Sequence, residues 1–271
     1  MCWLSCCYDA SNRFEPHKQA MIRLQGISKR FGDKAVLEDI HATFLPGKVN
    51  MVIGASGSGK SVLMKTMVGL VKPDAGHLYY QNLELGEMDM EQRNELRQKI
   101  GMLFQSAALF DSLTVQDNLL FPLRMFHPTP SAEMLTRVAY CLERVGLAGT
   151  EKLFPSELSG GMKKRVGIAR AIVLKPKFLF CDEPNSGLDP KTSIRIDHLI
   201  QDITSEFQIT TIVNTHDMNS VLECGEHIIF LNKGRKTWEG DRNLILQSDN
   251  EPLNELVYAS RFLQQFREKA S

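Results

Sequence analysis

Long apolar runs and a surplus of charge of one sign are both missing from this 271-residue sequence. No run approaches the roughly 20 apolar residues that a helix needs to span a bilayer, so a function at a membrane requires other chains to supply the spans. Lys and Arg number 32, and Asp and Glu also number 32. The sequence lacks the basic field that draws proteins to nucleic acid or anionic lipid, and no nucleic-acid partner is expected.

A disulfide framework is missing as well. Three of the six cysteines stand singly in apolar contexts, which is typical of reduced thiols: Cys141, Cys181 and Cys224. The others, Cys2, Cys6 and Cys7, lie in residues 1–20, which lack both a clear strand or helix period and the pattern of a signal peptide. A metal or lipid site is the alternative there, but we expect residues 1–20 to be a disordered tail, with Met21 a natural alternative start.

From residue 21 onward the sequence has the alternation of an α/β protein. With 43% hydrophobic residues it can bury a substantial core. Short apolar runs alternate with helical stretches, as strand–crossover–strand units require. The runs 178–181 and 209–213 do not alternate, which is typical of strands buried on both faces of a parallel sheet. Strands are expected at residues 22–27, 36–44, 49–53, 77–80, 100–104, 178–181, 210–214 and 228–231.

Helical sequence dominates from about residue 88 to residue 174, with breaks predicted at Phe121-Pro122 and at 127–130. We interpret this stretch as a helical subdomain inserted into the α/β core. Residues 251–270 begin with an early proline and place apolar residues near helical spacing, which predicts an amphipathic C-terminal helix. The expected organisation is a tail over 1–20, one nucleotide-binding domain over 21–246 and a helical extension over 247–271.

A glycine-rich loop follows one of the apolar strands and precedes a helix predicted over 61–69. Its sequence is Gly54-Ala55-Ser56-Gly57-Ser58-Gly59-Lys60-Ser61. Three glycines let the backbone curl so that successive N–H groups point at phosphate oxygens, and the helix adds the positive end of its dipole. Lys60 can reach the outer phosphates and the Ser61 hydroxyl can ligate Mg²⁺. A turn without a ligand is the alternative, but the strand–loop–helix context favours a nucleoside triphosphate site.

Two carboxylates, Asp182 and Glu183, end a later apolar strand. In phosphate-loop enzymes an acid at this place holds Mg²⁺ through water, a role that fits Asp182, and Glu183 can then orient or deprotonate the attacking water. His216 follows a further buried strand and can donate to the γ-phosphate. The alternatives are a solvated strand end for the acids and a loop or capping residue for the histidine.

The segment Leu158-Ser159-Gly160-Gly161-Met162 is a second glycine-rich helix start. Together with the phosphate loop it resembles the signature of ABC ATPases. Further motifs in the order of that family are Gln105 at a strand end, Ser186-Gly187-Leu188-Asp189 as the D-loop, and His216 as the switch histidine. Phe31 falls where an aromatic residue stacks on adenine in this family. The resemblance covers residues 21 to about 240 and implies a P-loop ATPase core with an inserted helical subdomain.

The resemblance also implies a mechanism. Two copies of the chain sandwich two ATP molecules head to tail, so that Ser159, Gly160 and Gly161 act on the ATP held by the phosphate loop of the partner copy. Gln105 joins Ser61 and Asp182 around Mg²⁺. ATP and Mg²⁺ are therefore the expected cofactors, and hydrolysis opens the dimer.

Finer features resemble the Mla-type ATPases: Ser61-Val62-Leu63, residues 101–115 with Asn118 and Phe121-Pro122-Leu123, and residues 158–170. Those ATPases energise phospholipid movement between the bacterial inner and outer membranes, together with a permease and an MCE-domain lipid-binding subunit. The resemblance implies a peripheral protein at the cytoplasmic face of the inner membrane. Residues 105–123 are then expected to couple nucleotide state to the permease through an apolar cluster of Ala107, Ala108, Leu109, Phe110 and Leu113.

Three alternatives stay open at this point. One is the ATPase of an importer for a small polar substrate such as an amino acid, and another is a regulatory ABC subunit that controls cell-wall enzymes. The third is a soluble ABC protein that acts on ribosomes or DNA. The third predicts two tandem cassettes or a long heptad insert, and the sequence has neither.

Overall fold

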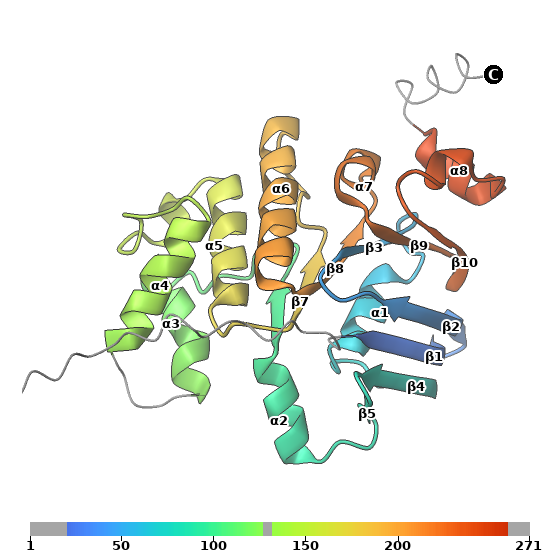
Figure 1. Ribbon diagram of the computed structural model, residues 1–271, viewed down its shortest axis with the longest axis horizontal. Coiled ribbons are helices and arrows are strands. Elements are labelled where there is room, and N and C mark those ends of the chain that lie inside the picture. The colour runs from blue at the N-terminus through green and yellow to red at the C-terminus, as the bar shows by residue number, and fades with distance from the viewer. Residues whose placement is uncertain (1–20, 127–131, 260–271) are drawn as a thin grey trace, which may run out of the picture.

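The computed structural model describes residues 21–126 and 132–259 (Figure 1). The expected tail over 1–20, the break predicted at 127–130 and the last part of the predicted C-terminal helix lie outside the described residues. Within them, the predicted α/β fold with an inserted helical subdomain is confirmed. None of the described helices is long and apolar enough to cross a membrane.

A six-stranded sheet forms the centre of the molecule, in the order β10-β9-β3-β8-β7-β6. Its strands are β3 (Val49–Ile53), β6 (Ile100–Leu103), β7 (Phe178–Asp182), β8 (Thr210–Thr215), β9 (His227–Asn232) and β10 (Arg235–Gly240). Neighbours from β6 to β9 pair in parallel and β10 pairs antiparallel. Every residue of β3 and β8 is buried, as helices on both faces of the sheet require. The carboxyl ends of β3, β6, β7 and β8 therefore meet at one edge.

A second, antiparallel sheet lies to one side, in the order β2-β1-β4-β5. Its strands are β1 (Ile22–Phe31), β2 (Lys34–Phe44), β4 (Ala75–Tyr80) and β5 (Leu83–Glu84). Buried and exposed residues alternate at the start of β1, because only one face of this sheet packs on the core. Tyr80 packs edge-on against Phe178 of the central sheet, with ring centroids 4.8 Å apart. One apolar cluster thus joins the two sheets.

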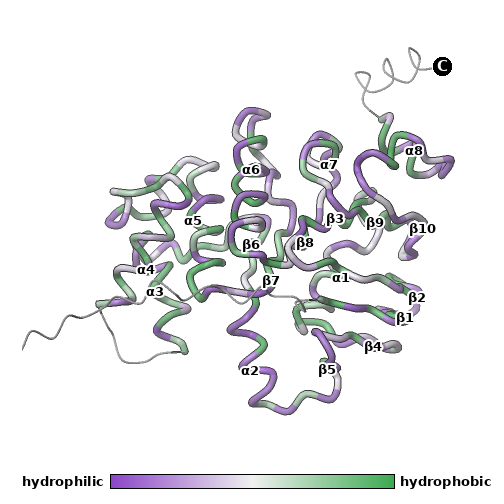
Figure 2. The backbone as a smooth tube through the Cα atoms, viewed as in Figure 1, coloured by the Kyte–Doolittle hydropathy of each residue, from purple (hydrophilic) through white to green (hydrophobic). Residues whose placement is uncertain are grey.

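The helices divide between the sheet and a separate group. Helices α1 (Lys60–Met67), α6 (Pro190–Phe207) and α7 (Met218–Cys224) lie along the central sheet, and α2 (Met90–Gln98) precedes β6. Helix α2 is largely hydrophilic and buries only Leu96 (Figure 2). Helices α3 (Val115–Phe126), α4 (Ala132–Arg144) and α5 (Gly160–Ile172), with the 3₁₀ turn η1 (Pro155–Glu157), are grouped beyond β6 at the end opposite the second sheet (Figure 1).

All eight predicted strands are present, although β1 ends at Phe31 rather than at residue 27. Two strands were not predicted: β5 has only two residues, and the polar, half-exposed β10 lacks an apolar run. The predicted break at Phe121-Pro122 is wrong, because α3 continues through Pro122. An internal proline costs about 3 kcal/mol, and burial of Leu119, Leu120 and Leu123 offsets that cost.

The C-terminal helix α8 (Glu251–Val257) follows the 3₁₀ turn η2 (Ile245–Gln247) and begins where predicted, and α8 itself ends at Val257. The Asn250 side chain caps its start by accepting from the Leu253 N–H. Leu253 and Val257 are buried, and Tyr258 and Ala259 form a turn. The helix therefore buries one face over two turns and stops.

The apolar cluster predicted over 107–113 is not a single surface. Ala107 is 1% exposed and the half-buried Leu109 packs against the main core cluster, whereas Ala108 is exposed. Phe110 remains 42% exposed and meets Phe121 of α3, with ring centroids 4.7 Å apart. Packing on the core accounts for Ala107 and for much of Leu109, and Ala108 and Phe110 are the exposed members of the cluster.

Candidate functional site

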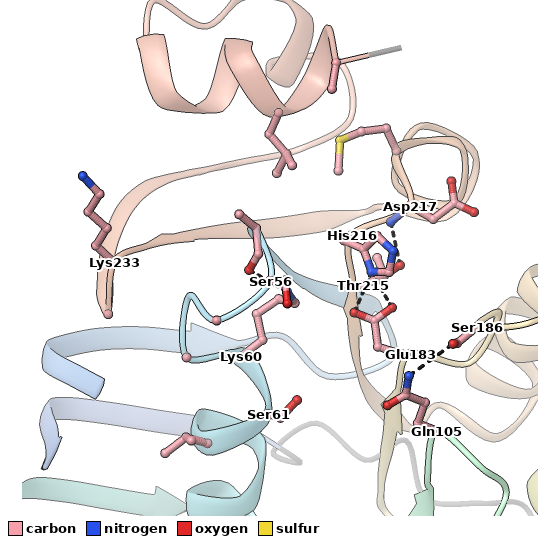
Figure 3. Close-up of a pocket in the computed structure, with 18 of the residues that line it drawn as sticks. Ser56, Lys60, Ser61, Gln105, Glu183, Ser186, Thr215, His216, Asp217 and Lys233 are labelled. Carbon is pink, nitrogen blue, oxygen red and sulfur yellow. Dashed lines mark hydrogen bonds and ion pairs between the residues drawn. The ribbon is translucent and has the colours of Figure 1, made fainter. Parts of the chain in front are cut away.

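A crevice of about 1310 Å³ opens at the edge of the central sheet where β3, β6, β7 and β8 end. In an open parallel sheet, this is the place where ligands bind. The loop after β3 supplies one wall and the ends of β7 and β8 supply the other (Figure 3). Ser56, Lys60 and Ser61 thus face Glu183 and His216, which are more than 120 positions away in the chain.

The phosphate loop between β3 and α1 requires its glycines. A Cβ at Gly54 would lie 2.3 Å from the Leu231 carbonyl oxygen, and one at Gly59 would lie 2.8 Å from that of Val36. The loop is also held from outside, because the Gly234 N–H in the turn between β9 and β10 donates to the Ser58 carbonyl at 3.1 Å. These close approaches fix a curled backbone whose N–H groups suit an anion.

Lys60, the first residue of α1, bends back over this loop. Its Nζ donates to the carbonyl oxygens of Gly54 at 2.7 Å and Ala55 at 3.2 Å, and the residue is 7% exposed. Burial lowers the pKa of Lys60, whereas the charges of Glu183 and Asp182 raise it. Its ammonium therefore lies in the crevice near two carboxylates. There its positive charge can bind the negative charge of a polyphosphate.

Asp182 ends β7 and faces the start of α1. Its Oδ1 lies 3.3 Å from Ser61 Oγ and accepts from Asn214 Nδ2 at 3.1 Å. Gln105, two residues after β6, donates from Nε2 to Ser186 Oγ at 3.2 Å and also lines the crevice. Ser61 and Gln105 thus line the crevice from separate elements, and Asp182 lies beside it in contact with Ser61.

This donor set fits Mg²⁺. Hydroxyl, carboxylate and amide oxygens are the hard ligands that Mg²⁺ prefers, and it usually takes only one or two carboxylates and completes its shell with water and phosphate. The described residues contain no cluster of three His, Cys, Asp or Glu side chains that could hold a metal without such help. The Ser58 hydroxyl, buried and without a hydrogen-bond partner in the described part of the chain, adds a polar group directed at the loop.

Glu183 follows Asp182 in a left-handed backbone conformation, with φ of 48°. Its side chain is 14% exposed and a carboxylate oxygen lies 2.9 Å from His216 Nδ1, whereas the histidine side chain is 65% exposed. The carboxylate is therefore sheltered at the crevice wall, and the imidazole lies over it on the solvent side (Figure 3). A carboxylate oriented in this way can accept a proton from a water molecule at the crevice.

Phe31 ends β1 on the surface. It is 52% exposed, so it is not a core residue, and Lys29 Nζ lies 5.4 Å from the centroid of its ring. The neighbouring part of the crevice is lined by Lys34, Ala35 and Val36, rather than by Phe31 itself. An exposed ring beside the crevice is available for stacking on a flat base.

The signature residues do not reach the crevice of the same protomer. Ser159, Gly160 and Gly161 line a separate pocket of about 530 Å³ with Leu188 and Asp189. Ser159 caps α5 by accepting from the Met162 N–H at 3.3 Å. A Cβ at Gly161 would lie 2.6 Å from Thr192 Cγ2, so only glycine fits there without a shift. In one protomer the phosphate loop and the signature residues therefore line two different pockets.

Several residues near the crevice were not singled out from the sequence. Asn185 is buried and donates from Nδ2 to Asp197 Oδ1 at 2.8 Å and to Ser220 Oγ at 2.9 Å. Burial raises the pKa of Asp197. Lys164 is also buried and contacts the backbone of Gln105 and Glu183. No local motif marks these residues, because their partners come from distant parts of the chain.

Comparisons with known proteins show the family of the chain. The family model described as "ABC transporter" matches residues 37–186, more than half of the 271 residues. The chain is 35% identical over 261 residues to the "Probable ribonucleotide transport ATP-binding protein mkl" of Mycobacterium tuberculosis, which covers 94% of this chain and 73% of that protein.

Two further matches add a second relative and a structure. The chain is 41% identical over 207 residues to the "Methionine import ATP-binding protein MetN" of Carboxydothermus hydrogenoformans, covering 76% of this chain and 61% of that protein. The structure resembles the ATP-binding cassette MJ0796, solved as a dimer in a post-hydrolysis state with ADP and Pi. That match has 30% identity and a TM-score of 0.74, and covers 82% of this chain and 98% of the other. The chain therefore belongs to the ABC transporter family, as an ATP-binding subunit that hydrolyses ATP.

Proposed function

We propose that ATP lies in the crevice with its phosphates on the loop 54–61 and its adenine against Phe31. The backbone N–H groups of Gly54, Ala55, Ser56, Gly57, Ser58 and Gly59 face the phosphates, with the Lys60 ammonium beside them. Ser61, Gln105 and Asp182 would hold Mg²⁺, which when bound would neutralise charge on the outer phosphates. The convergence of these groups at the ends of β3, β6 and β7 supports this arrangement.

Glu183 then acts as the general base. A water oxygen forms a bond to the γ-phosphorus, the bond from that phosphorus to the β–γ bridging oxygen breaks, and the water proton goes to the Glu183 carboxylate. With both ring nitrogens protonated, His216 donates from Nδ1 to the carboxylate and from Nε2 to the γ-phosphate. The observation that carries this role is the 2.9 Å contact between His216 Nδ1 and the sheltered carboxylate of Glu183.

The working unit is a head-to-tail dimer. In one protomer the signature residues Ser159, Gly160 and Gly161 line a different pocket from the phosphate loop, so a second copy must turn its signature toward the first copy's ATP. The cassette MJ0796, which this chain resembles, was solved as a dimer. Such an arrangement makes ATP part of the interface and lets hydrolysis release it.

The dimer serves a membrane-embedded permease, as a peripheral protein on the cytoplasmic face of the inner membrane. Phe110, Phe121 and Met125 are 42%, 41% and 62% exposed and supply apolar surface at the outer side of the α3–α5 group. Phe110 lies five residues after Gln105, so a movement of Gln105 with nucleotide state is passed on over a short stretch of chain. Apolar side chains at such a place suit a partner's helix.

The cargo proposed is phospholipid, moved between the bacterial inner and outer membranes to maintain lipid asymmetry, with an MCE-domain lipid-binding subunit as a further partner. Support comes from the resemblance of residues 101–123 and 158–170 to the Mla-type ATPases. Import of a small polar solute is the second candidate, favoured by the names of the relatives, which concern ribonucleotide transport and methionine import.

One experiment separates the two cargoes. A strain that lacks this gene is complemented with the wild-type chain or with Glu183→Gln, and both detergent sensitivity and uptake of radiolabelled methionine and ribonucleotides are measured. Phospholipid transport predicts detergent sensitivity that only the wild-type chain reverses, with normal uptake. Loss of uptake with an intact outer membrane would transfer the assignment to the importer class.

A further inference from the structure

A buried lysine, Lys164, connects helix α5 with the loop after β6 and with the residue after β7, which lie apart in the sequence. Lys164 lies in the second turn of α5, is 5% exposed, and donates from Nζ to the backbone carbonyl oxygens of Gln105 and Glu183, the latter at 3.1 Å. Burial lowers the pKa of Lys164, and the nearby groups Cys181, Glu183 and Asp182 raise it. Removal of the ammonium from water is thus compensated by hydrogen bonds to two carbonyls of the proposed hydrolysis site.

The contact with Gln105 belongs to a broader attachment of α5 to the loop after β6. Arg170 of the same helix donates to the carbonyl oxygens of Ala107 at 2.7 Å and Ala108 at 2.8 Å. Ala107 and Ala108 have φ of 61° and 46°, a conformation that is unfavourable without such anchoring. A Cβ at Gly167 would lie 2.7 Å from Leu103 Cδ1, so helix and strand are in close contact here. The loop that carries Gln105 is fixed to α5 on both sides of its turn.

The contact with Glu183 acts on a strained residue. Glu183 has φ of 48°, which costs a non-glycine residue energy unless its surroundings hold it. Its N–H donates to the Asn214 carbonyl at 2.9 Å, and its own carbonyl accepts from Lys164 Nζ and from the Ser186 N–H at 3.2 Å. These three backbone contacts, with His216 on the carboxylate, fix the direction of the side chain.

We infer that Lys164 is a positioning residue for ATP hydrolysis: from the helix that begins at the signature, its ammonium fixes the backbone of Gln105 and Glu183 and thereby aims the amide of one and the carboxylate of the other. The inference rests on the roles proposed above for Gln105 and Glu183. Since α5 starts at Gly160, a shift of the signature on contact with a partner's ATP is transmitted through Lys164 to the base of its own site. Lys164 itself touches no reacting atom.

The first test replaces Lys164 with Met, which keeps the length of the side chain and removes its donors. Misplacement by a fraction of an ångström can lower a rate about 10- to 100-fold, so kcat for ATP should fall by that factor while the Kd for ATP changes less than about threefold. Lys164→Arg, which keeps a buried cation with donors, should recover a substantial part of kcat. Lys163→Met is the matched control, because Lys163 is the adjacent residue of α5 and no side-chain contact joins it to Gln105 or Glu183 among the described residues.

Thermal unfolding and ATP binding of each variant show whether it is folded. Unchanged kcat in folded Lys164→Met, or equal losses in Lys164→Met and Lys163→Met, would overturn the inference. If Lys164→Met does not fold, the same comparison is made with Lys164→Ala, which also removes the donors. A folded Lys164→Ala with wild-type kcat and Kd would likewise contradict the positioning role.

The second test is a double-mutant cycle with Glu183→Gln, followed by single-turnover hydrolysis of radiolabelled ATP. If Lys164 acts through Glu183, Lys164→Met should lower the rate in the wild-type background and add little in the Glu183→Gln background. If the two substitutions lower the hydrolysis rate independently, so that their factors multiply in the double variant, the inference is overturned and the role of Glu183 is left intact. Near-normal hydrolysis by Glu183→Gln alone would instead overturn the proposed base, and with it the positioning role.

Discussion

His216 Nδ1 lies 2.9 Å from the carboxylate of Glu183, although 33 positions separate the two residues in the sequence. The contact joins the ends of β7 and β8, which are neighbours in the central sheet. Use of Nδ1 leaves Nε2 without a hydrogen-bond partner among the described residues, on a side chain that is 65% exposed. The pair thus presents a sheltered carboxylate acceptor and an accessible ring nitrogen to the same crevice. With both ring nitrogens protonated, Nε2 is a donor, so the pair suits a base and a phosphate contact respectively.

Replacement of Glu183 by Gln should abolish most hydrolysis while ATP still binds. The amide keeps the size and polarity of the side chain but cannot take a proton, and a positioned base contributes about 10²- to 10⁴-fold. The variant should accumulate as an ATP-bound dimer, measurable by size-exclusion chromatography, with turnover measured as phosphate release. Near-normal turnover in the purified variant would show that the base lies elsewhere.

Action in trans can be tested with cysteines at Ser56 and Ser159. These residues lie in different pockets of one protomer, so the head-to-tail dimer predicts an intermolecular cross-link that forms only with ATP. Cross-linking without ATP provides the control. Products that are intramolecular, or that form equally without nucleotide, are incompatible with a shared site.

Mixing two inactive chains gives an independent measure of the same arrangement. Lys60→Ala breaks the phosphate loop of its own chain, and Gly160→Glu places a negative charge against the partner's ATP. The mixed dimer contains one site with both halves intact, so partial ATPase activity should return relative to either variant alone. Lys60→Ala alone, at the same total protein concentration, is the control. ATPase activity in that control would point to contamination rather than to shared sites.

The sequence allowed prediction of most of the site because its motifs are local. The loop 54–61, the acids at 182–183 and His216 each follow an apolar strand, and strand ends of a parallel sheet meet at one edge. The sequence could not reveal the partners of Lys164, Asn185 and Asp197, because those contacts depend on tertiary packing rather than on spacing. The break predicted at Pro122 failed for a related reason: three leucines buried in the core outweigh a local propensity.

Phe31 should contribute to nucleotide affinity through its ring. Stacking of a base on an aromatic side chain is worth about 1–3 kcal/mol by alanine substitution in nucleic-acid systems, so Phe31→Ala should weaken ATP binding by about tenfold or more. Phe31→Tyr keeps the ring and should have a mild effect. Binding of a fluorescent ATP analogue measures both, and wild-type affinity in both variants would exclude a role in stacking.

Docking to a membrane partner should depend on the exposed pair Phe110 and Phe121. Their ring centroids lie 4.7 Å apart, and both side chains are about two-fifths exposed, at 42% and 41%. The backbone beneath them is fixed, because the buried Asn118 side chain accepts from the Phe110 N–H at 2.8 Å and donates to its carbonyl at 3.1 Å. A change at the ring therefore alters the surface and leaves the loop in place.

Phe110→Glu should consequently detach the protein from its membrane complex while thermal stability and ATP binding remain near the wild-type values. Burying the new carboxylate against a partner's apolar helix would cost several kcal/mol, whereas in the free protein it stays in water. Leu83→Glu is the matched control, because Leu83 is 52% exposed but lies on β5 of the second sheet, away from the α3–α5 group (Figure 1). The measurement is co-purification of the permease with the tagged chain from solubilised membranes. Equal recovery with Phe110→Glu and with wild-type protein would place the docking surface elsewhere, and equal loss with Leu83→Glu would show a general effect of added charge.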